Sequence, residues 1–153
     1  MNNKIKTYIK SILIPVIVGG VVGLIISKYI DYETLKQPPL APPSIAFPIV
    51  WTILYILMGY SYGMLRVEEK TTKEIDDIYY LQLFVNALWP IIFFVLKWRF
   101  VAFLWIIALA VLIGIMISRF YEKNKTAGLI QIPYLIWTLF ATYLNIGVYL
   151  LNK

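Results

Sequence analysis

Long uncharged runs dominate this chain of 153 residues. A helix needs roughly 20 apolar residues to cross the hydrocarbon core of a bilayer, within a range of about 17–25. Five runs without Asp, Glu, Lys or Arg reach that length, and they cover residues 11–27, 37–65, 78–96, 100–118 and 126–152. Five runs of this size predict an all-α membrane protein, folded as a bundle of five transmembrane helices.

Composition supports this fold class over the alternatives. Hydrophobic residues make up 61% of the chain and charged residues 14%, whereas soluble domains are about 45–50% apolar and about 25% charged. A disordered chain needs low hydrophobicity, and a transmembrane β-barrel needs strands of about 10 alternating residues. Lys4, Lys6 and Lys10 precede the first run as in a signal peptide, but no small-residue cleavage site follows it, so we predict a retained helix.

We expect a single domain over residues 1–153. Its predicted helices cover about residues 8–29, 47–65, 78–96, 100–118 and 127–150. A long loop over residues 30–46 joins the first two helices and holds four prolines within six residues, Pro38, Pro39, Pro42 and Pro43. Such a segment cannot continue a helix and favours a stiff, extended backbone.

The distribution of Lys and Arg predicts the orientation of the bundle. Nine of these residues flank the helix ends on the amino-terminal side, and five lie on the opposite side. The positive-inside rule therefore places the amino terminus in the cytoplasm and the carboxyl terminus outside. The net charge of +6 fits helix flanks near anionic lipid. The basic residues are scattered, so we expect the lipid bilayer as a partner and no nucleic acid.

The missing residue types exclude whole classes of chemistry. The chain has no His and no Cys, which excludes disulfide scaffolds, zinc sites, iron–sulfur clusters and Ser-His or Cys-His nucleophile pairs. We expect no metal site. The predicted helix interiors carry no ionisable side chain of the kind that pumps use, and the sequence offers no acid–base pair for hydrolytic chemistry.

Aromatic and amide side chains recur at helical spacing in three of the predicted helices. Steps of three or four residues place each set on one face of its helix. The sets are Phe47, Trp51, Tyr55 and Met58; Tyr79, Gln82, Asn86, Trp89 and Phe93; and Tyr134, Trp137, Ala141 and Asn145. Unsatisfied amides are costly in lipid, so we predict that Gln82, Asn86 and Asn145 face the bundle interior.

Two interpretations of these faces remain open. The first is ordinary helix packing, with the amides bonding one helix to another. The second is a pocket for a flat, largely apolar ligand that a few polar groups orient. We expect the three faces to meet at a similar depth beneath the proline-rich loop, which makes the pocket as strong an interpretation as packing. Two glycine pairs, Gly19 with Gly23 and Gly59 with Gly63, suit close helix packing within one chain or between chains.

These segments resemble the translocator protein family, also called tryptophan-rich sensory proteins or peripheral-type benzodiazepine receptors. The resemblance covers nearly the whole chain and rests on three parts of it. They are PPLAPPSIAFPIVW over residues 38–51; Gln82, Asn86, Trp89, Pro90 and Phe93; and Pro133, Tyr134, Trp137, Ala141 and Asn145. Residues 66–77 and the fourth predicted helix match the family pattern weakly.

The resemblance implies a five-helix bundle that forms a homodimer and sits in a bacterial cell membrane. It also implies a cavity near the first loop that binds porphyrins such as protoporphyrin IX, and isoquinoline carboxamide or benzodiazepine ligands, with no covalently bound cofactor. The implied ligand-binding residues are Tyr32, Pro42, Phe47, Trp51, Asn86, Trp89, Trp137, Ala141 and Leu144. Mammalian members bind cholesterol through their carboxyl-terminal segment, which corresponds here to Leu144, Tyr149 and Lys153.

Three functions follow from this resemblance as hypotheses. The first is a receptor for porphyrin-type tetrapyrroles in stress sensing or tetrapyrrole homeostasis. The second is light- and oxygen-dependent degradation of a bound porphyrin, in which Trp51 and Trp137 would be the catalytic residues. The third is tetrapyrrole transport. Because no His or Cys is available as an axial ligand, we expect metal-free porphyrin to be preferred over haem.

Overall fold

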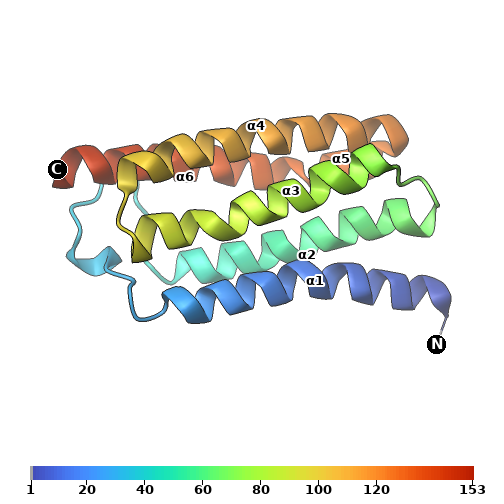
Figure 1. Cartoon of the computed structure of the whole chain (residues 1–153), viewed down its shortest axis with the longest axis horizontal. Helices are drawn as coiled ribbons and strands as arrows, with labels where there is room; N and C mark the ends of the chain where they lie inside the picture. Colours follow the sequence, from blue (N-terminus) through green and yellow to red (C-terminus); the bar gives the residue numbers. More distant parts are fainter. Residues whose placement is uncertain (1) are drawn as a thin grey trace.

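Five helical spans, each long and apolar enough to cross a membrane, pack side by side in the computed structural model (Figure 1). The structure describes residues 2–153, and this part of the chain contains no β-strand. The elements are α1 (Asn3–Ile26), the 3₁₀ turn η1 (Tyr32–Thr34), α2 (Ala46–Val67), α3 (Lys73–Pro90), the π-helical turn η2 (Ile91–Val95), α4 (Arg99–Lys123), α5 (Lys125–Ile130) and α6 (Ile132–Asn152). The predicted fold class is therefore confirmed.

The two ends of the bundle differ in their connections. One end, here called the loop end, carries the long connection over residues 27–45, the turn over residues 96–98 and the carboxyl terminus (Figure 1). The opposite end carries the start of α1, residues 68–72 between α2 and α3, and the junction of α4 with α5. Helices α3 and α4 pack as the antiparallel neighbours that their short connection predicts.

Several helices extend beyond the boundaries predicted from charge. α1 begins at Asn3 and ends at Ile26 rather than covering residues 8–29, α3 begins at Lys73, and α4 continues to Lys123. Caps explain two of these starts, because the Asn2 side chain accepts from the Lys4 amide and the Thr72 side chain accepts from the Ile75 amide. A charged residue ends an apolar run but does not have to end the helix. Its long side chain can extend so that the charged group reaches polar surroundings while the backbone stays helical.

The predicted helix over residues 127–150 corresponds to one membrane span, Lys125–Asn152, that is not a continuous α-helix. The backbone breaks at Gln131, which separates α5 from α6. Pro133 lies in the first turn of α6, where its missing N–H costs little. Side-chain hydrogen bonds join this region to α2: the Ser61 hydroxyl of α2 donates to the Ala127 carbonyl oxygen at 2.7 Å, and the Gln131 side-chain amide at the break donates to the Met58 carbonyl oxygen of α2 at 3.4 Å.

A second irregular turn follows Pro90. Proline has no N–H to continue the hydrogen-bond ladder of α3, and the chain passes into the π-helical turn η2 before Lys97 adopts a φ of 56° in the connection to α4. Within η2 the Phe93 side chain is buried. The irregular turn thus directs an aromatic ring inward at the loop end.

Glycines bring α1 and α2 into backbone contact away from the loop end. A Cβ placed on Gly59 would lie 2.4 Å from the carbonyl oxygen of Ser11, and one on Gly63 would lie 3.0 Å from the Tyr8 ring. The glycine pair Gly59 and Gly63 therefore packs within this chain. The predicted homodimer has to use a different surface if it forms.

Candidate functional site: a cavity at the loop end

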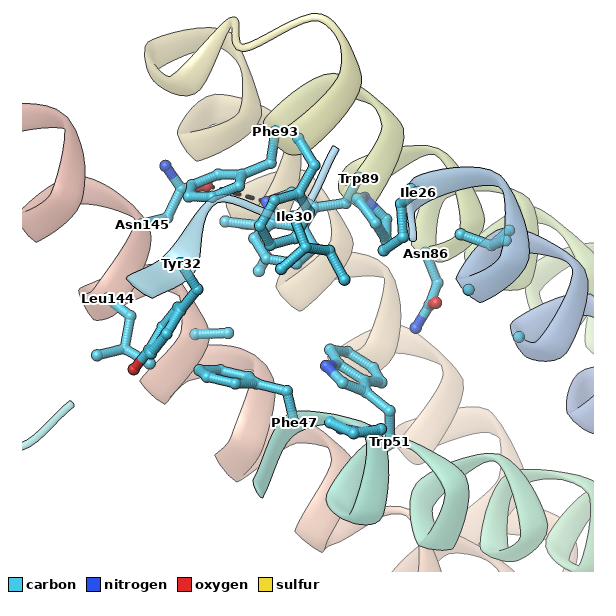
Figure 2. A pocket seen from close by; sticks show the side chains of 18 of the residues that line it. Ile26, Ile30, Tyr32, Phe47, Trp51, Asn86, Trp89, Phe93, Leu144 and Asn145 are labelled. Atoms are coloured by element: carbon cyan, nitrogen blue, oxygen red, sulfur yellow. Dashed lines mark hydrogen bonds between the residues drawn. The ribbon is translucent and has the colours of Figure 1, made fainter. Parts of the chain in front are cut away.

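A cavity of about 490 Å³ lies between the helices at the loop end. Its walls come from α1, α2, α3, η2, α4 and α6, and the connection over residues 27–45 covers it. Aromatic rings form two opposed walls, with Phe47 and Trp51 of α2 on one side and Trp89 and Phe93 on the other (Figure 2). This volume falls within the range of about 300–1,000 Å³ that is typical of small-molecule sites.

The structure brings most of the residues predicted as ligand-binding together around this cavity. Seven of them line it: Tyr32, Phe47, Trp51, Asn86, Trp89, Ala141 and Leu144. They come from α2, α3 and α6 and from the covering loop. Ala141 and Leu144 are buried, while the three aromatic rings of α2 and α3 are half-buried.

Two predicted residues, Pro42 and Trp137, do not line the cavity. The Pro42 carbonyl oxygen accepts a hydrogen bond from the Tyr32 hydroxyl, so Pro42 supports a wall residue from behind. The Trp137 ring packs edge-on against Phe47, with 5.8 Å between the ring centroids, and lies behind that wall. Its indole N–H is buried without a hydrogen-bond partner in the described part of the chain.

A chain of buried polar groups closes the floor of the cavity. The Tyr55 hydroxyl donates to Asn86 Oδ1 at 2.6 Å, and Asn86 Nδ2 donates to the Tyr134 hydroxyl at 2.7 Å. The Tyr134 hydroxyl in turn donates to Gln82 Oε1 at 2.8 Å. The prediction that Gln82 and Asn86 face the interior is confirmed, because their exposed fractions are 0% and 2%. Asn86 both joins three helices and borders the cavity, so packing and pocket coexist.

A second amide connects the cavity wall to the first residue of α4. Trp89 Nε1 donates to Asn145 Oδ1 at 2.9 Å, and Asn145 Nδ2 donates to the Arg99 carbonyl oxygen at 2.8 Å. Asn145 is 1% exposed, which confirms its predicted inward position. The Trp89 indole is therefore held in one orientation with its ring at the cavity.

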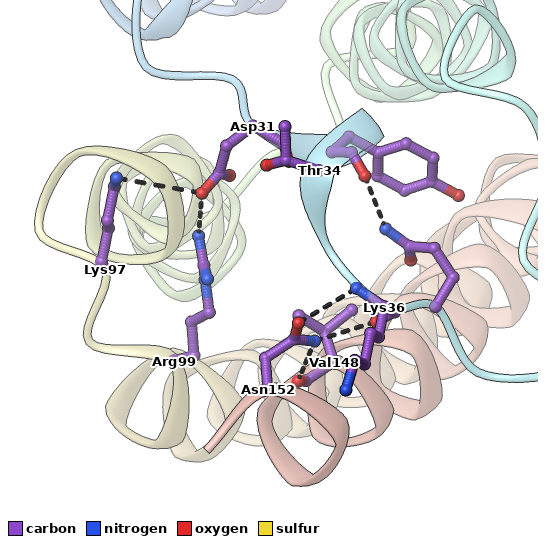
Figure 3. A network of polar contacts seen from close by, with 9 residues as sticks. Asp31, Thr34, Lys36, Lys97, Arg99, Val148 and Asn152 are labelled. Carbon is purple, nitrogen blue, oxygen red and sulfur yellow. Dashed lines mark hydrogen bonds and ion pairs between the residues drawn. The ribbon is translucent and has the colours of Figure 1, made fainter.

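Polar contacts hold the covering loop onto α4 and α6 (Figure 3). Arg99 Nη2 lies 2.7 Å from Asp31 Oδ2, and Lys97 Nζ lies 3.9 Å from the same oxygen. The Asn152 side chain pairs with both backbone groups of Lys36, accepting from its N–H at 3.0 Å and donating to its carbonyl oxygen at 2.9 Å. Nearby, the Tyr143 hydroxyl donates to the Pro39 carbonyl oxygen at 2.6 Å.

Sequence reasoning missed the contribution of α1 to the site. Val16, Gly19, Gly20, Gly23 and Ile26 all line the cavity, and the glycine cluster was the signal that could have indicated a wall there. Tyr55, Phe93 and Asn145 also line it. These three residues lie on the predicted helix faces but were not named as ligand-binding.

The lining is suited to binding rather than to acid–base chemistry. No Asp, Glu, Lys or Arg is among the described residues that line the cavity, and no cluster of metal-binding side chains occurs within residues 2–153. Polar groups at the cavity are amides and hydroxyls, such as those of Asn86, Gln37 and Ser44. The arrangement offers apolar, stacking contact with a few directional hydrogen bonds.

The sterol-like pattern at the carboxyl terminus does not present a joint surface to lipid. Leu144 is 6% exposed and faces the internal cavity. The Tyr149 ring instead packs on Phe100 of α4, with 5.4 Å between the ring centroids. The pattern residues therefore belong to different surfaces of α6.

Comparison with known proteins assigns a family to nearly the whole chain. The family model described as TspO/MBR matches residues 11–151. The chain is 32% identical to the translocator protein homolog of Schizosaccharomyces pombe, over 96% of this chain and 93% of the relative. It is 33% identical to the tryptophan-rich protein TspO of Chlorobaculum tepidum, over 79% and 78%, and 30% identical to the translocator protein of sheep (Ovis aries), over 74% and 70%.

Proposed function

Since this chain belongs to the TspO/MBR family and is an integral membrane protein, we propose that its cavity is a receptor site for porphyrin-type tetrapyrroles such as protoporphyrin IX. The same site would take flat ligands of the isoquinoline carboxamide and benzodiazepine types. The biological role would be stress sensing or tetrapyrrole homeostasis. The observation that carries this proposal is the pair of opposed aromatic walls around a cavity that no charged residue among residues 2–153 lines.

Those walls suit a flat conjugated ligand. Trp51 and Phe47 face Trp89 and Phe93 across the cavity (Figure 2), and aromatic side chains stack on planar π-systems. The Asn86 amide has one N–H beyond the bond that it donates to Tyr134, so it is available to a polar edge of the ligand. Because the sequence has neither His nor Cys, we expect metal-free porphyrin to bind more tightly than haem.

A titration of protoporphyrin IX into the nanodisc-embedded protein in the dark tests the proposal. Porphyrin absorbance and quenching of Trp fluorescence would report binding. Trp51→Ala and Trp89→Ala each remove a wall ring, and Trp98→Ala is the matched control, because Trp98 lies in the turn before α4 and is 57% exposed. We expect saturable binding in the control and at least about fivefold weaker binding in each wall variant, since a base-sized ring stacked on an aromatic side chain contributes about 1–3 kcal/mol.

Either of two results would overturn this proposal. Binding that does not saturate would mean simple partition into the disc. Equal affinity for the wall variants and the Trp98→Ala control would mean that the rings only pack the bundle.

A second candidate function is light- and oxygen-dependent degradation of the bound porphyrin. The position of Trp51 favours it, because this oxidisable ring lines the cavity itself. Two further oxidisable rings adjoin it, with centroid separations of 5.8 Å to Tyr55 and 6.3 Å to Tyr134. Illumination of the saturated complex, with loss of the porphyrin absorbance as readout, tests this function separately from binding.

We further propose a bacterial cell membrane as the location, with the amino terminus in the cytoplasm. The support is the excess of Lys and Arg at the end of the bundle opposite the loop end. Under this orientation the covered cavity faces the outer leaflet. Labelling of single cysteines introduced at Asn2 and Asn152 in intact cells would distinguish the two orientations.

A further inference from the structure

We propose that ligands reach the cavity from within the lipid bilayer, through an opening between the loop-end halves of α1 and α2, and not through the covering loop. This inference rests on the proposed porphyrin site. It narrows the ligand class to flat molecules that partition into membranes, and it assigns Gly20, Gly23 and Thr52 as the residues that border the opening.

The location of the opening follows from which lining residues are exposed. Residues that both line a cavity and face the outside mark where that cavity opens. Among the described lining residues, the exposed ones are Gly20, Gly23, Ile30, Pro48 and Thr52. All of them lie on α1, just after it, or in the first two turns of α2, while the α6 lining is buried.

The packing of α1 explains why the gap exists at this end. Away from the loop end, Gly59 allows the α2 backbone to touch Ser11, which leaves no room for a ligand. Gly19 then meets the Tyr55 ring, with an added Cβ only 2.4 Å from it. A Cβ on Gly20, the next residue, or on Gly23, one turn beyond Gly19, would meet nothing within 4 Å. The contact between the two helices therefore gives way to open space towards the loop end.

The depth of this opening places it against lipid. Gly20 lies six residues before the end of α1 at Ile26, which corresponds to about 9 Å along a helix at about 1.5 Å per residue. The hydrocarbon core is about 30 Å thick, so a gap that reaches Gly20 extends below the headgroups of one leaflet. A membrane-dissolved planar molecule can reach it without crossing water.

The covering loop, in contrast, is fastened on the far side of the cavity. Asp31 pairs with Arg99, and the Lys36 backbone pairs twice with Asn152 (Figure 3). The Pro39 carbonyl oxygen also accepts a hydrogen bond from the Tyr143 hydroxyl. Pro38 packs so closely on α6 that a Cβ on Gly147 would lie 2.6 Å from its ring. Access under the loop would require all of these contacts to break, whereas the gap between α1 and α2 is already present.

Binding kinetics with matched variants test the route. Protoporphyrin IX carried by lipid vesicles is mixed with the nanodisc-embedded protein, and Trp quenching gives the association and dissociation rates. Gly23→Phe puts a large ring in the opening, and Gly114→Phe is its control, because Gly114 of α4 also has nothing within 4 Å of an added Cβ and does not line the cavity. A disulfide between Lys36→Cys and Asn152→Cys, in a chain without other cysteines, locks the loop.

We expect Gly23→Phe to slow association by about tenfold relative to Gly114→Phe, which corresponds to a barrier raised by about 1.4 kcal/mol. Dissociation should slow as well, because the ligand leaves through the same opening. The locked loop should leave both rates unchanged. Thr52→Trp, which narrows the opening from α2, should reproduce the slowing and serves if Gly23→Phe does not fold.

Three results would overturn the route. The first is unchanged association and dissociation rates in both Gly23→Phe and Thr52→Trp. The second is slow rates in the variant with the locked loop alone. The third is faster dissociation in Gly23→Phe without slower association, which would mean that the new ring fills the cavity. A wild-type protein that does not bind protoporphyrin IX would instead overturn the proposed function. The two failures are therefore distinguishable.

Discussion

The contact of Gly59 with Ser11 gives a sharp prediction about stability. In Gly59→Ala the new methyl group would lie 2.4 Å from the Ser11 carbonyl oxygen and 2.5 Å from Ile12 Cα, whereas ordinary contacts begin at 3.4 Å. Both obstacles are backbone atoms, so no side chain can rotate away. Helix α1 must retreat by about 1 Å, and a gap of that size forfeits about a quarter to a half of the dispersion energy across the contact.

The expected loss is a net of about 1–2 kcal/mol in the free energy of unfolding. Overpacking of this kind destabilises a protein by about 1–3 kcal/mol. Replacing a helical glycine with alanine stabilises the helix by about 0.5–1 kcal/mol, which offsets part of this loss. Gly114→Ala is the matched control, because its Cβ meets nothing within 4 Å, so only the propensity gain applies. Gly63→Ala should fall between the two, since its nearest obstacle is the Tyr8 ring at 3.0 Å.

Unfolding by sodium dodecyl sulfate in mixed micelles, followed by Trp fluorescence, measures these differences. The reasoning would be refuted if Gly59→Ala were as stable as Gly114→Ala. It would also be refuted if Gly63→Ala were the least stable of the three, because the backbone contact at Gly59 would then not set the spacing of α1 and α2.

Three further outcomes are expected. A double-mutant cycle of Tyr55→Phe with Asn86→Leu should give a coupling energy of about 0.6–1.7 kcal/mol, as for other intramembrane hydrogen bonds. Additive effects of the two substitutions in the same unfolding assay would contradict the hydrogen bond between Tyr55 and Asn86. Under illumination, Trp51→Phe should slow the loss of bound porphyrin far more than Trp137→Phe does, because Phe47 separates Trp137 from the cavity. Equal rates for the two variants in a photobleaching assay would argue against direct contact between Trp51 and the porphyrin. Burial and the neighbouring charge of Glu33 raise the pKa of the Tyr32 phenol above 10.0. The stability difference between wild type and Tyr32→Phe should therefore be constant below about pH 10 and vanish as the pH rises through the raised pKa, and thermal unfolding from about pH 8 to 11 checks it.

The number and order of the helices could be predicted because charge is costly in lipid and its spacing is visible in the sequence. The ends of the helices could not be predicted in this way. Charged residues such as Lys73 and Lys123 lie outside the apolar runs but still belong to the helices. The break at Gln131 is accompanied by hydrogen bonds with Ser61 and Met58 of α2. These partners are distant in sequence, so the local pattern of residues 127–150 did not show it.

The residues of the candidate site could also be predicted only in part. Helical spacing could group Asn86 with Trp89 on one face of α3, because it places residues on one face of one helix, and both residues line the cavity. The spacing does not say how far each face is rotated relative to its neighbours, and this is why Trp137 lies behind Phe47 instead of beside it. The wall contributed by α1 was missed because glycines such as Gly20 carry no side chain that signals a role.

The pairing of Asn152 with Lys36 has a consequence for the order of assembly in the membrane. These residues are 116 positions apart in the chain, and contacts between such distant residues form late because loop closure must precede them. The contact of Gly59 with Ser11 requires only the first two spans. During synthesis α1 and α2 can pair early, while the cavity gains its fastened cover only after α6 has been inserted, so a nascent chain would hold the binding site open until its last span is in place.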